Sequence, residues 1–516
     1  MLPDYHQFEE FKNRSRKLNE IKDLGIEPYP HKYEPKDRAK DLAQAYESES
    51  VASSEEAMEG KSPFVSLAGR LMLFRAMGKN AFAQIQDDTA SFQMMFSRDC
   101  LEIEGYDPGS LDINQAPSAI KVLEKKFDLG DWIGVEGHLF RTQKGELTVL
   151  VKKAKLLCKS LLPLADKHGG LIDKELRYRK RWLDLICSRE VKDTFVLRSK
   201  IMRSIRQHFE DSSFMEVETP VLQNIYGGAN ARPFVTQFHA LDEQKMYLRI
   251  SLEIALKKLL VGGFERVYEI GKVFRNESID KNHNPEFSLL EAYAAYWDYN
   301  DMMLFVENLF EKLALDLYGT TILEIPTMDG RLESVDFKAP WVRLSVKQSV
   351  QKYAGIDPDT KTENDLRELL RGTMEDKALN EASKEMLIFY LFEEKVEHLL
   401  IQPHHIIDHP VETTPLCKAH KIEKGLVERF ESFILGQEIC NAYTELNDPE
   451  LQRELLISQD RGGEEDQPVD EEFLEAVCQG MPPAGGIGIG IDRLVMLLSK
   501  VTSIRDVLFF PFMKEQ

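Results

Sequence analysis

The sequence contains no C-x-x-C pair, although it has six cysteines. Without such a pair, neither a zinc ribbon nor a thioredoxin-like redox motif is supported. Scattered thiols are typical of proteins from reducing compartments, where disulfides are rare. We therefore expect all six to be reduced and structural: Cys100, Cys158, Cys187, Cys417, Cys440 and Cys478.

Long apolar runs are missing as well. No window approaches the roughly 20 apolar residues that span a bilayer. The opening stretch, MLPDYHQFEEFKNRSRK, lacks the apolar core of a signal peptide. Hydrophobic residues still make up 43% of the 516 residues, enough for the cores of roughly two to four domains. These features favour a cytoplasmic enzyme or assembly protein with no membrane partner.

Positive charge does not balance negative charge: 66 Lys and Arg face 87 Asp and Glu, which gives a formal net charge of −21 at pH 7. Because nucleic acids attract Lys and Arg, this sum argues against a nucleic-acid partner. Net charge constrains solubility more than the chemistry of a site, however. Two basic clusters do occur, VKKAKLLCK at 151–159 and ELRYRKRWLDL at 175–185. Taken alone, they are best explained as solvated faces or linker.

The G-x-G-x-x-G and G-x-x-x-x-G-K-[ST] phosphate motifs are absent, so neither a dinucleotide fold nor a P-loop is indicated. Instead, AGGIGIGIDRLVMLL (484–498) alternates glycine with isoleucine. In a strand, the isoleucines can be buried while the glycines leave the other face bare for a flat ligand. Arg493 then opens an apolar helix, where its charge suits a phosphate.

Residues 64–157 contain five short runs of β-forming residues between turn residues. This pattern predicts a small barrel such as an OB-fold, which often binds oligonucleotides. Further on, FMEVETPVL (214–222) reads as a strand in which Pro220 ends regular pairing or confines the strand to an edge.

The stretch FRNESIDKNHNPEFSLLEAY, from Phe274 to Tyr293, crowds charged and aromatic residues together. Residues 265–277 have strand character, and 285–296 can form the return strand. With a period of two, Arg275 shares a face with Glu277, and four residues of the return strand also share a face, so the two strands present cationic, anionic and aromatic groups together. These four are Phe287, Leu289, Glu291 and Tyr293. The alternative is an exposed sheet face with ordinary salt bridges.

A third segment, GQEICNAYTELNDPE (436–450), carries Glu438 and Glu445 seven residues apart. On a flat strand they point to opposite faces, so a bulge or bend would be needed to converge them. Converged carboxylates would suit Mg²⁺ bridging phosphate oxygens; the alternative is two unrelated surface acids. Nearby, QPHHIIDHPVETTPLCK (402–418) carries three histidines that fit a metal site or, more commonly, core or surface positions. They are His404, His405 and His409.

Together these segments resemble class II aminoacyl-tRNA synthetases, and among them the lysyl-tRNA synthetases of the bacterial type. FMEVETP is similar to the first motif of that class, which helps to form the dimer interface. FRNESIDKNHNPEF is similar to the second motif and GIGIGIDRL to the third. GGANARPF (227–234) and EICNAYTELNDPE (438–450) match as well. The resemblance covers roughly residues 5–516, in one order.

The resemblance implies an α+β multidomain protein. We expect an N-terminal helical extension (1–62), an OB-fold anticodon-binding domain (63–160), a linker or hinge (161–186) and a class II catalytic domain (187–516). The catalytic domain is expected to have an antiparallel sheet flanked by helices and a helical insertion near 361–400. A homodimer is inferred from the first motif alone.

The implied activity is that of a lysine–tRNA ligase, which uses ATP to form lysyl-adenylate and pyrophosphate and then transfers lysine to the 3′ end of tRNA(Lys). The first step is an in-line displacement at the α-phosphate, so positioning and charge stabilisation dominate and no protein nucleophile is needed. Up to three Mg²⁺ ions per subunit are expected with ATP.

The resemblance also implies roles for single residues. Arg275 and Arg493 are the expected catalytic residues. The expected ATP contacts are Arg275, Glu277, His283, Asn284, Phe287, Glu438 and Arg493. The expected lysine contacts are Gly228 or its neighbour Gly227, Glu253, Arg275, Glu291, Tyr293, Asn447 and Glu450. The expected metal ligands are Glu438 and Glu445. The expected anticodon contacts are Arg75, Phe82, Gln93 and Glu146, with a place in the barrel core as the alternative for Phe82.

The sequence departs from the family pattern at Ser251 and Leu252, where an Ala-Pro pair is expected; this puts the local geometry in doubt, not the function. Three other functions were weighed. An aspartyl or asparaginyl synthetase would need cationic or amide groups in its pocket, whereas Glu291 with Tyr293 favours a cationic substrate. A ligase that lysylates a protein would lack the barrel. A tRNA-binding regulator would show a decayed site, and no such decay is visible.

Overall fold

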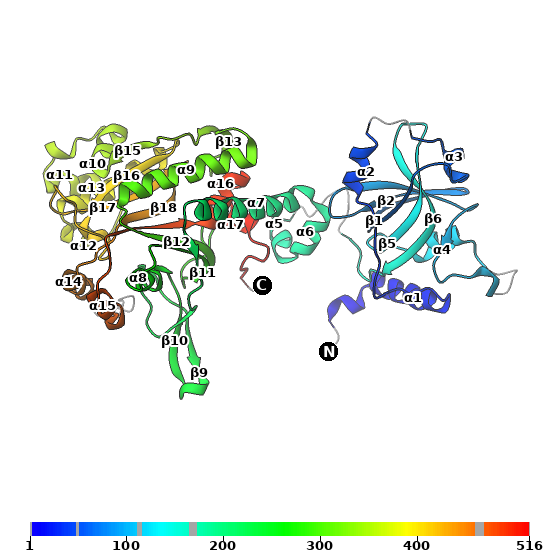
Figure 1. Cartoon of the computed structure of the whole chain (residues 1–516), viewed down its shortest axis with the longest axis horizontal. Coiled ribbons are helices and arrows are strands. Elements are labelled where there is room, and N and C mark those ends of the chain that lie inside the picture. The colour runs from blue at the N-terminus through cyan, green and yellow to red at the C-terminus, as the bar shows by residue number, and fades with distance from the viewer. Residues whose placement is uncertain (1–2, 48–50, 111–115, 165–172, 460–468, 515–516) are drawn as a thin grey trace. The chain divides into compact units, whose positions relative to one another are not determined.

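The computed structural model of the chain describes residues 3–47, 51–110, 116–164, 173–459 and 469–514. The chain forms two compact units, residues 1–172 and residues 173–516. Figure 1 colours the first from blue to cyan and the second from cyan-green to red. The expected hinge at 161–186 lies partly outside the described residues; its second half forms α5 and α6 of the second unit.

The first unit is built on a closed five-stranded barrel. β1 pairs with β2 and β5, β2 with β3, and β5 with β6, and a parallel pairing of β3 with β6 closes the ring. The strands are β1 (Phe64–Met77), β2 (Asn80–Gln86), β3 (Ser91–Ser97), β5 (Trp132–Arg141) and β6 (Leu147–Cys158). Alternate residues are buried, as in β2, so one side of each strand fills the interior. This confirms the predicted OB-fold.

Short elements surround the barrel. They are η1 (Asp4–Gln7), α1 (Glu9–Asp23), α2 (Ala39–Ala45), α3 (Ser54–Met58), β4 (Glu102–Ile103), η2 (Pro108–Ser110) and α4 (Ala119–Lys126). Helix α1 ends before Gly25, whose φ of +80° suits glycine. The expected N-terminal helix is therefore present.

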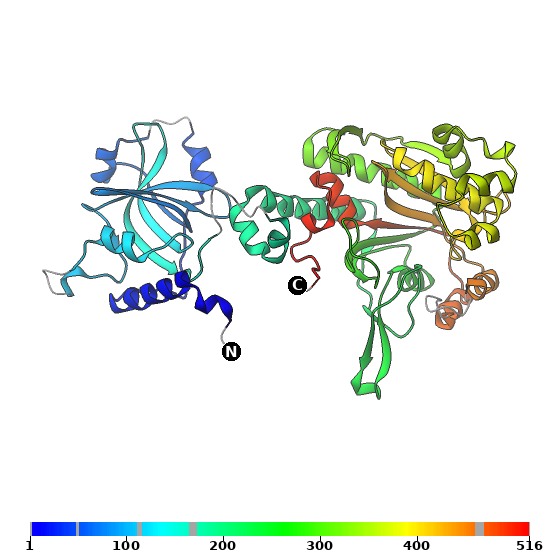
Figure 2. The ribbon, with the colours of Figure 1, turned by 180° about the vertical axis from the view of Figure 1, so that it is seen from behind.

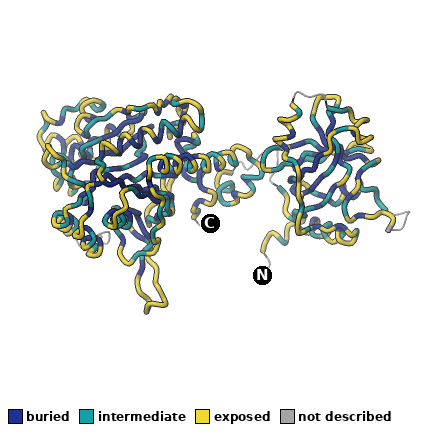
Figure 3. Tube along the Cα trace, in the orientation of Figure 1, coloured by how far each residue is buried: buried dark blue, intermediate teal, exposed yellow. Residues whose placement is uncertain are grey.

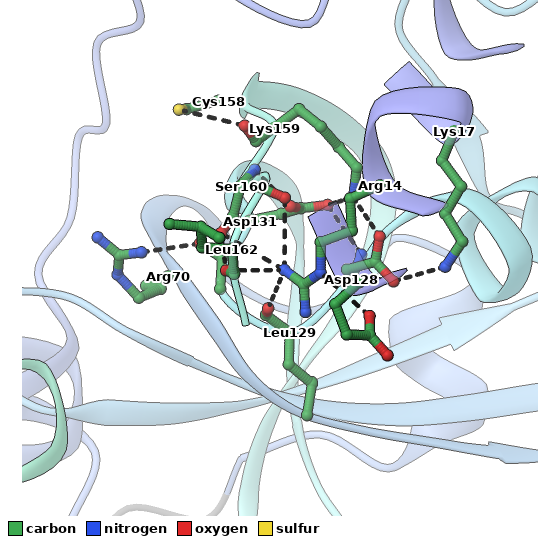
Figure 4. Close-up of polar contacts among 12 residues, drawn as sticks. Arg14, Lys17, Arg70, Asp128, Leu129, Asp131, Cys158, Lys159, Ser160 and Leu162 are labelled. Atoms are coloured by element: carbon green, nitrogen blue, oxygen red, sulfur yellow. Dashed lines mark hydrogen bonds and ion pairs between the residues drawn. The ribbon is translucent and has the colours of Figure 1, made fainter. Parts of the chain in front are cut away.

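A polar cluster fastens α1 to the barrel where the chain leaves β6 (Figure 4). Arg14 donates to the carbonyl oxygens of Leu129, Ser160 and Leu162 at 3.0, 3.3 and 3.2 Å. The buried Lys159 ammonium pairs with Asp131 at 2.8 Å, and also with Asp128. Because each buried charge has a partner, the cluster stabilises this junction.

The second unit contains an eight-stranded sheet in the order β15-β16-β17-β18-β19-β12-β11-β7. Only the pairs β7–β11 and β15–β16 are parallel. The strands are β7 (Met215–Glu216), β11 (Arg266–Phe274), β12 (Glu286–Ala295), β15 (Val342–Ser345), β16 (His404–Pro410), β17 (Leu426–Ile434), β18 (Gln437–Thr444) and β19 (Ala484–Gly490).

Three helices cover one face of this sheet (Figures 1 and 2): α7 (Arg189–Asp211), α9 (Tyr299–Tyr318) and α16 (Ile491–Ser499). They form the main core with the inward residues of β12, β18 and β19. Figure 3 shows the central strands of this sheet as buried, and it shows as exposed the tip of the hairpin formed by β9 (Val235–Phe238) and β10 (Gln244–Leu248). The antiparallel sheet flanked by helices confirms the predicted fold class.

The remaining helices of the second unit are α5 (Lys174–Arg179), α6 (Arg181–Cys187), α8 (Glu253–Val261), α10 (Val346–Ser349), α11 (Glu363–Leu370), α12 (Asp376–Glu381), α13 (Lys384–Lys395), α14 (Pro449–Gln459), α15 (Glu471–Cys478) and α17 (Ile504–Val507). The short helical turns are η3 (His239–Leu241), η4 (Val350–Ala354), η5 (Pro358–Thr360), η6 (Glu397–Leu399) and η7 (Val411–Thr413). The small strands are β8 (Leu222–Gln223), β9 (Val235–Phe238), β10 (Gln244–Leu248), β13 (Ile322–Pro326) and β14 (Leu332–Asp336).

The prediction that Pro220 ends regular pairing or confines its strand to an edge is confirmed. Pairing stops between the two-residue strands β7 and β8, because Pro220 has no N–H to continue a ladder, and β7 lies at the edge of the large sheet. The strand is shorter than predicted, and a second local prediction was wrong. Strand β11 ends at Phe274 instead of reaching residue 277. There the Asn276 N–H donates to the Arg232 carbonyl at 2.8 Å, so Arg275 and Glu277 lie on the connection between β11 and β12.

The three histidines of β16 are side chains of the sheet interior. All three are buried. Tyr353 and His404 share a 2.6 Å hydrogen bond, and His405 stacks on Trp341. Among the described residues, no group of three or more His, Cys, Asp or Glu side chains is placed to hold a metal ion. Within those same ranges, no helix is long and apolar enough to cross a membrane. The core explanation of these histidines is confirmed.

Candidate active site

The open face of the eight-stranded sheet carries a cavity of about 690 Å³. Its floor is formed by β12, β18 and β19, and residues of α8, the β11–β12 connection and the start of α16 contribute its walls. Of the expected ATP and lysine residues, all but Asn447 and Glu450 line it. The structure therefore gathers most of the predicted site in one place.

Strand β19 supplies the bare floor that the glycine pattern predicted. Gly486, Gly488 and Gly490 face the cavity, whereas Ile487 and Ile489 belong to the core beneath. A Cβ on Gly486 would lie 1.9 Å from Glu445 Oε1 and 2.5 Å from the Tyr293 ring. Only glycine therefore fits where β19 passes these side chains.

Glu291 of β12 is a buried carboxylate in the cavity wall. Its Oε1 accepts from the Ser251 hydroxyl and the Leu252 N–H, both at 3.0 Å, and Oε2 accepts from the Tyr293 hydroxyl at 3.1 Å. Burial and the nearby charge of Glu253 raise the pKa of Glu291 to about 7. The unexpected Ser-Leu pair thus holds Glu291, and a proline at 252 could not donate this N–H.

Glu253 begins α8 and lies one helical turn from Lys257, so the two side chains share a face. Lys257 is fully buried, and its ammonium donates to Glu253 Oε1 at 2.6 Å. The same oxygen accepts from the Tyr443 hydroxyl at 2.7 Å. Close by, Gly228 has a positive φ, and its backbone approaches Ser251 so closely that a Cβ on Gly228 would lie 2.7 Å from Ser251 Oγ.

Glu445 is completely buried just beyond the end of β18. It forms an ion pair with Lys257 through Oε2. Among the described residues, no donor lies within hydrogen-bonding distance of Oε1. Burial raises the pKa of Glu445 to about 8, although Lys257 opposes the shift. A buried acceptor with no protein partner takes its donor from ordered water, an ion or a ligand.

Arg275 and Phe287 lie next to each other in the cavity. The Arg275 guanidinium carbon is 5.2 Å from the centre of the Phe287 ring, and its Nε donates to the Ile250 carbonyl at 3.4 Å. Burial lowers the pKa of Arg275, which Glu277, Glu291 and Glu438 oppose. An arginine keeps its charge at neutral pH, so this fork can bind carboxylate or phosphate oxygens.

Arg493 lies in the first turn of α16 and faces the other end of the cavity. It donates to the Glu438 carbonyl oxygen at 2.9 Å and lies 3.4 Å from His283 Nε2. The Asn284 side chain donates to the Glu286 carbonyl at 2.6 Å and accepts from the Phe512 N–H at 3.2 Å. These groups form a polar rim to which the exposed Glu277 also belongs.

Glu438 meets Glu431 and not Glu445. The pairing of β17 with β18 shifts between Ser432 and Phe433, a bulge that returns Glu438 to the cavity face. Seven residues of strand still separate the Cα atoms of Glu438 and Glu445 by roughly 20 Å. Burial and the charge of Glu431 raise the pKa of Glu438. The pKa of Glu445 is raised by burial, Glu253 and Glu291 and is lowered by Lys257, so the two carboxylates have different neighbours. The two carboxylates expected to share metal are therefore not brought together.

Two expected lysine contacts also lie elsewhere. The Asn447 side chain accepts from Lys418 Nζ at 2.8 Å and donates to the Met481 carbonyl at 3.1 Å. Glu450 is exposed at the start of α14, beside a small separate depression with Arg453 and Glu471. The chain turns into α14 directly after the ELND segment, and this carries both residues away from the cavity.

Known protein families account for most of the chain. The family described as "tRNA synthetases class II (D, K and N)" matches residues 173–514, and the "OB-fold nucleic acid binding domain" matches residues 65–157. The chain belongs to the class II tRNA synthetases. The predicted family is thereby confirmed.

Relatives named lysine–tRNA ligase match this class II synthetase over almost its whole length. The protein from Chlamydia pneumoniae is 55% identical over 521 residues, covering 99% of this chain and 98% of the relative. That from Carboxydothermus hydrogenoformans is 44% identical, covering 98% and 97%. That from Methanoculleus marisnigri is 43% identical, covering 96% and 94%. These identities place the chain in the lysine branch of the family.

In the first unit, the residues expected to contact the anticodon lie on the outer side of the barrel or at its rim. Arg75 of β1 is paired with Phe82 of β2 in the antiparallel register. Phe82 is half-buried between the buried Ala81 and Ala83, so it points away from the interior. Gln93 of β3 donates to the Thr148 hydroxyl at 2.9 Å, and Glu146 is exposed in the turn before β6.

Several residues of this synthetase site were missed. Lys257 reads from sequence as an ordinary helix residue, and Glu431 as one acid of an alternating strand. Arg429, which donates to Glu431 at 2.5 Å and to Asn441 at 3.1 Å, was missed as well. A two-residue period along the strand was a signal that could have placed Glu445. Residues 441, 443 and 445 share a face by this period, so it predicts that Glu445 lies with Tyr443 at the pocket and not with Glu438.

Proposed function

We propose that this class II synthetase is a lysine–tRNA ligase, which activates L-lysine with ATP and transfers it to the 3′ end of tRNA(Lys). The observation that carries the proposal is a set of three buried carboxylates: Glu253 and Glu291 line the cavity, and Glu445 lies against its floor at Gly486. Among the described residues, Glu445 Oε1 has no protein donor. A buried ammonium group is the partner that such oxygens need.

Lysine is bound through both of its ammonium groups. Glu445 Oε1, at the glycine floor beside Tyr293, receives the side-chain ammonium, with Glu291 and the Tyr293 hydroxyl next to it. Glu253 and the backbone of Gly228 receive the α-ammonium. The substrate carboxylate points to Arg275. This assignment is supported by burial and by the open acceptor, and it replaces the metal role expected of Glu445.

ATP occupies the other half of the cavity. Phe287, over which the Arg275 guanidinium lies at 5.2 Å, offers a ring face for adenine, and Arg493 approaches from the start of α16. His283, Asn284 and Glu277 add polar groups along the β11–β12 connection. Arg275 then lies between the lysine carboxylate and the α-phosphate, where a planar guanidinium suits both anions.

Divalent metal is expected with the nucleotide, and Glu438 with Glu431 are the residues that fit it. Glu431 is buried and Glu438 is partly exposed at the cavity, and the repulsion between the two carboxylates contributes to the raised pKa of Glu438. A divalent cation would relieve this repulsion and accept oxygen ligands. When bound, Mg²⁺ supplies charge neutralisation to the phosphates.

The chemistry requires no protein nucleophile. The lysine carboxylate attacks the α-phosphate in line and pyrophosphate leaves, so the protein acts by holding the two anions together and stabilising the charge that builds up. Arg275 and Arg493 supply that stabilisation. Water is limited because the carboxylates and tyrosines of the lysine half are buried.

The barrel is proposed to bind the anticodon, with Phe82 as a stacking platform and Arg75, Gln93 and Glu146 as contacts to base edges or backbone. We also propose that the enzyme functions as a homodimer in the cytoplasm. Exposed apolar side chains at the first motif, Met215, Val221 and Leu222, support such an interface.

The nearest alternative is an aspartyl or asparaginyl synthetase. Its substrate side chain would bring a carboxylate or amide beside Glu291 and Glu445, and the carboxylate would be repelled. The negative charge of the pocket therefore disfavours this alternative.

ATP–pyrophosphate exchange with each of the twenty amino acids separately tests the proposal. Exchange with lysine alone is the expected result, followed by charging of tRNA(Lys). Exchange with aspartate or asparagine would overturn the pocket assignment. No exchange at all by folded protein with Mg²⁺ would instead favour a tRNA-binding regulator.

A further inference from the structure

A lysine of the protein itself lies behind the wall of the lysine pocket. Lys257 is fully buried in α8, between the carboxylates of Glu253 and Glu445. The rings of Tyr443 and Phe473 lie 5.6 and 6.0 Å from its ammonium nitrogen. Burying a charged lysine is costly unless it is paired and hydrogen-bonded, so this position calls for a specific role.

The contacts of Lys257 divide each carboxylate into two halves. Its ammonium donates to Glu253 Oε1 at 2.6 Å and pairs with Glu445 through Oε2. Glu445 Oε1 remains without a protein donor among the described residues. Lys257 therefore anchors the far side of each carboxylate while the near side remains for the substrate.

Negative charge exceeds positive charge around the pocket. With all three carboxylates ionised, as they are when they pair with ammonium, Glu253, Glu291 and Glu445 contribute three negative charges and Lys257 one positive charge, so two negative charges are left for the substrate. Free lysine brings two ammonium groups. Without Lys257 the three carboxylates would repel one another with no buried protein cation between Glu253 and Glu445 to offset their charge.

We propose that Lys257 is a positioning and specificity residue of the lysine pocket. Its ammonium orients Glu445 and Glu253 and reduces the negative charge of the pocket to the value that two substrate ammonium groups neutralise. The inference rests on the proposed function, because it takes this pocket as the site of lysine.

The groups that face this ion-pair cluster come from several elements. Glu253 belongs to α8, Glu291 and Tyr293 to β12, Tyr443 to β18, and Cys417 lies opposite Glu445 across an isolated bridge. Glu253 and Glu445 raise the pKa of Lys257 above its ordinary value, outweighing the opposite effect of burial. Lys257 in turn lowers the pKa of Glu445, against the effects of burial, Glu253 and Glu291.

The test compares Lys257→Met, which keeps length and removes charge, with Lys257→Arg, which keeps charge. Kinetics of ATP–pyrophosphate exchange are measured from acid to alkaline pH. For Lys257→Met we expect the KM for lysine to rise about tenfold or more with the KM for ATP unchanged. The acid limb of kcat/KM for lysine should move up by about one to three pH units. Lys257→Arg should keep the acid limb in place.

Two further variants make the outcomes distinct. Lys258→Met removes the neighbouring lysine, which pairs with the exposed Glu472, and should change nothing. Glu445→Gln should raise the KM for lysine strongly. Adding Lys257→Met to Glu445→Gln should raise this KM by a smaller factor than Lys257→Met does in the wild-type enzyme, since the effects of coupled residues are non-additive.

The results separate this inference from the proposed function. A Lys257→Met enzyme with unchanged KM and pH profile, while Glu445→Gln is impaired, would overturn the role of Lys257 alone. An unimpaired Glu445→Gln enzyme would overturn the pocket assignment itself. If Lys257→Met and Lys257→Gln both fail to fold while Glu445→Gln folds, the role of Lys257 is structural and the proposal fails.

Discussion

Gly486 and Glu445 touch across the floor of the lysine pocket. A Cβ built on Gly486 would lie 1.9 Å from Glu445 Oε1, closer than any real contact allows. That oxygen is the one without a donor among the described residues. The glycine of β19 therefore makes room for the carboxylate that we assign to the substrate ammonium.

Substitution of Gly486 by alanine should impair lysine binding. The added methyl group would displace Glu445, and a displacement of about 1 Å costs roughly 100-fold in a well-oriented site. We expect the KM for lysine in the exchange reaction to rise by about 10- to 100-fold, with a smaller change for ATP. Gly488→Ala is the matched control, because its Cβ would lie at an ordinary 3.8 Å from Glu291 Cγ. Equal losses of lysine affinity in both variants would contradict this assignment.

The lysine pocket should also make substrate binding depend on pH. Burial raises the pKa of Glu291 to about 7 and that of Glu445 to about 8. The protonated forms cannot pair with ammonium, so kcat/KM for lysine should rise as the pH increases from about 6 to about 8, since this parameter reports the free enzyme. Calorimetry in two buffers of different ionisation enthalpy should show release of about one proton on lysine binding at neutral pH. Binding without proton release would contradict the raised pKa values.

The same shifts have a defined effect on folding. Both carboxylates have folded-state pKa values above the ordinary value for glutamate, so the folded empty enzyme holds protons that the unfolded chain releases. Their contribution to the free energy of unfolding is therefore present at low pH and is lost as the pH rises through about 7 to 8. Lysine binding should consequently raise the melting temperature more at alkaline than at acidic pH.

Local patterns carried much of this information in the sequence. The alternation of glycine and isoleucine at 486–491 predicted a buried side and a bare side of one strand, and β19 has both. The period-two set on 287–293 predicted a cavity-facing row on β12. Five short β-runs predicted the closed barrel. In each case one buried face dictates the register, and this leaves a clear periodic signal.

Other parts of the site depend on contacts that periodicity does not encode. Glu431 reaches Glu438 from the neighbouring strand β17, and Lys257 reaches Glu445 from α8; neither pairing leaves a spacing signal. The bulge in β18 inserts one extra residue into the strand, so the side chains beyond it point to the opposite face from the one that simple alternation predicts. Asn447 and Glu450 were misplaced because the start of α14 directs them away from the cavity.

Removal of the Phe82 ring should weaken tRNA binding without affecting amino-acid activation. Phe82 is half-buried on the outer side of the barrel and paired in register with Arg75. Stacking of a base on an aromatic ring contributes about 1–3 kcal/mol, so Phe82→Ala should raise the KM for tRNA(Lys) by roughly 5- to 150-fold. Phe64→Ala, which removes an exposed ring that packs on His138 elsewhere on the barrel, is the control. Loss of exchange activity in Phe82→Ala would indicate a structural role instead.

The proposed metal site predicts a different response to Mg²⁺ in two glutamate variants. Glu431→Gln removes one of two adjacent carboxylates, so more Mg²⁺ should be needed for half-maximal exchange, by about tenfold for the loss of one charged ligand. The KM for lysine should stay near its normal value, because Glu431 contacts Arg429 and not the lysine half of the cavity. Glu445→Gln should show the opposite pattern, with impaired lysine binding and an unchanged Mg²⁺ requirement. Glu423→Gln, at an exposed position, controls for bulk charge. If Glu445→Gln instead raised the Mg²⁺ requirement and Glu431→Gln did not, the metal would belong with Glu445. In that case the partner of Glu445 Oε1 would be a metal cation and not the substrate ammonium.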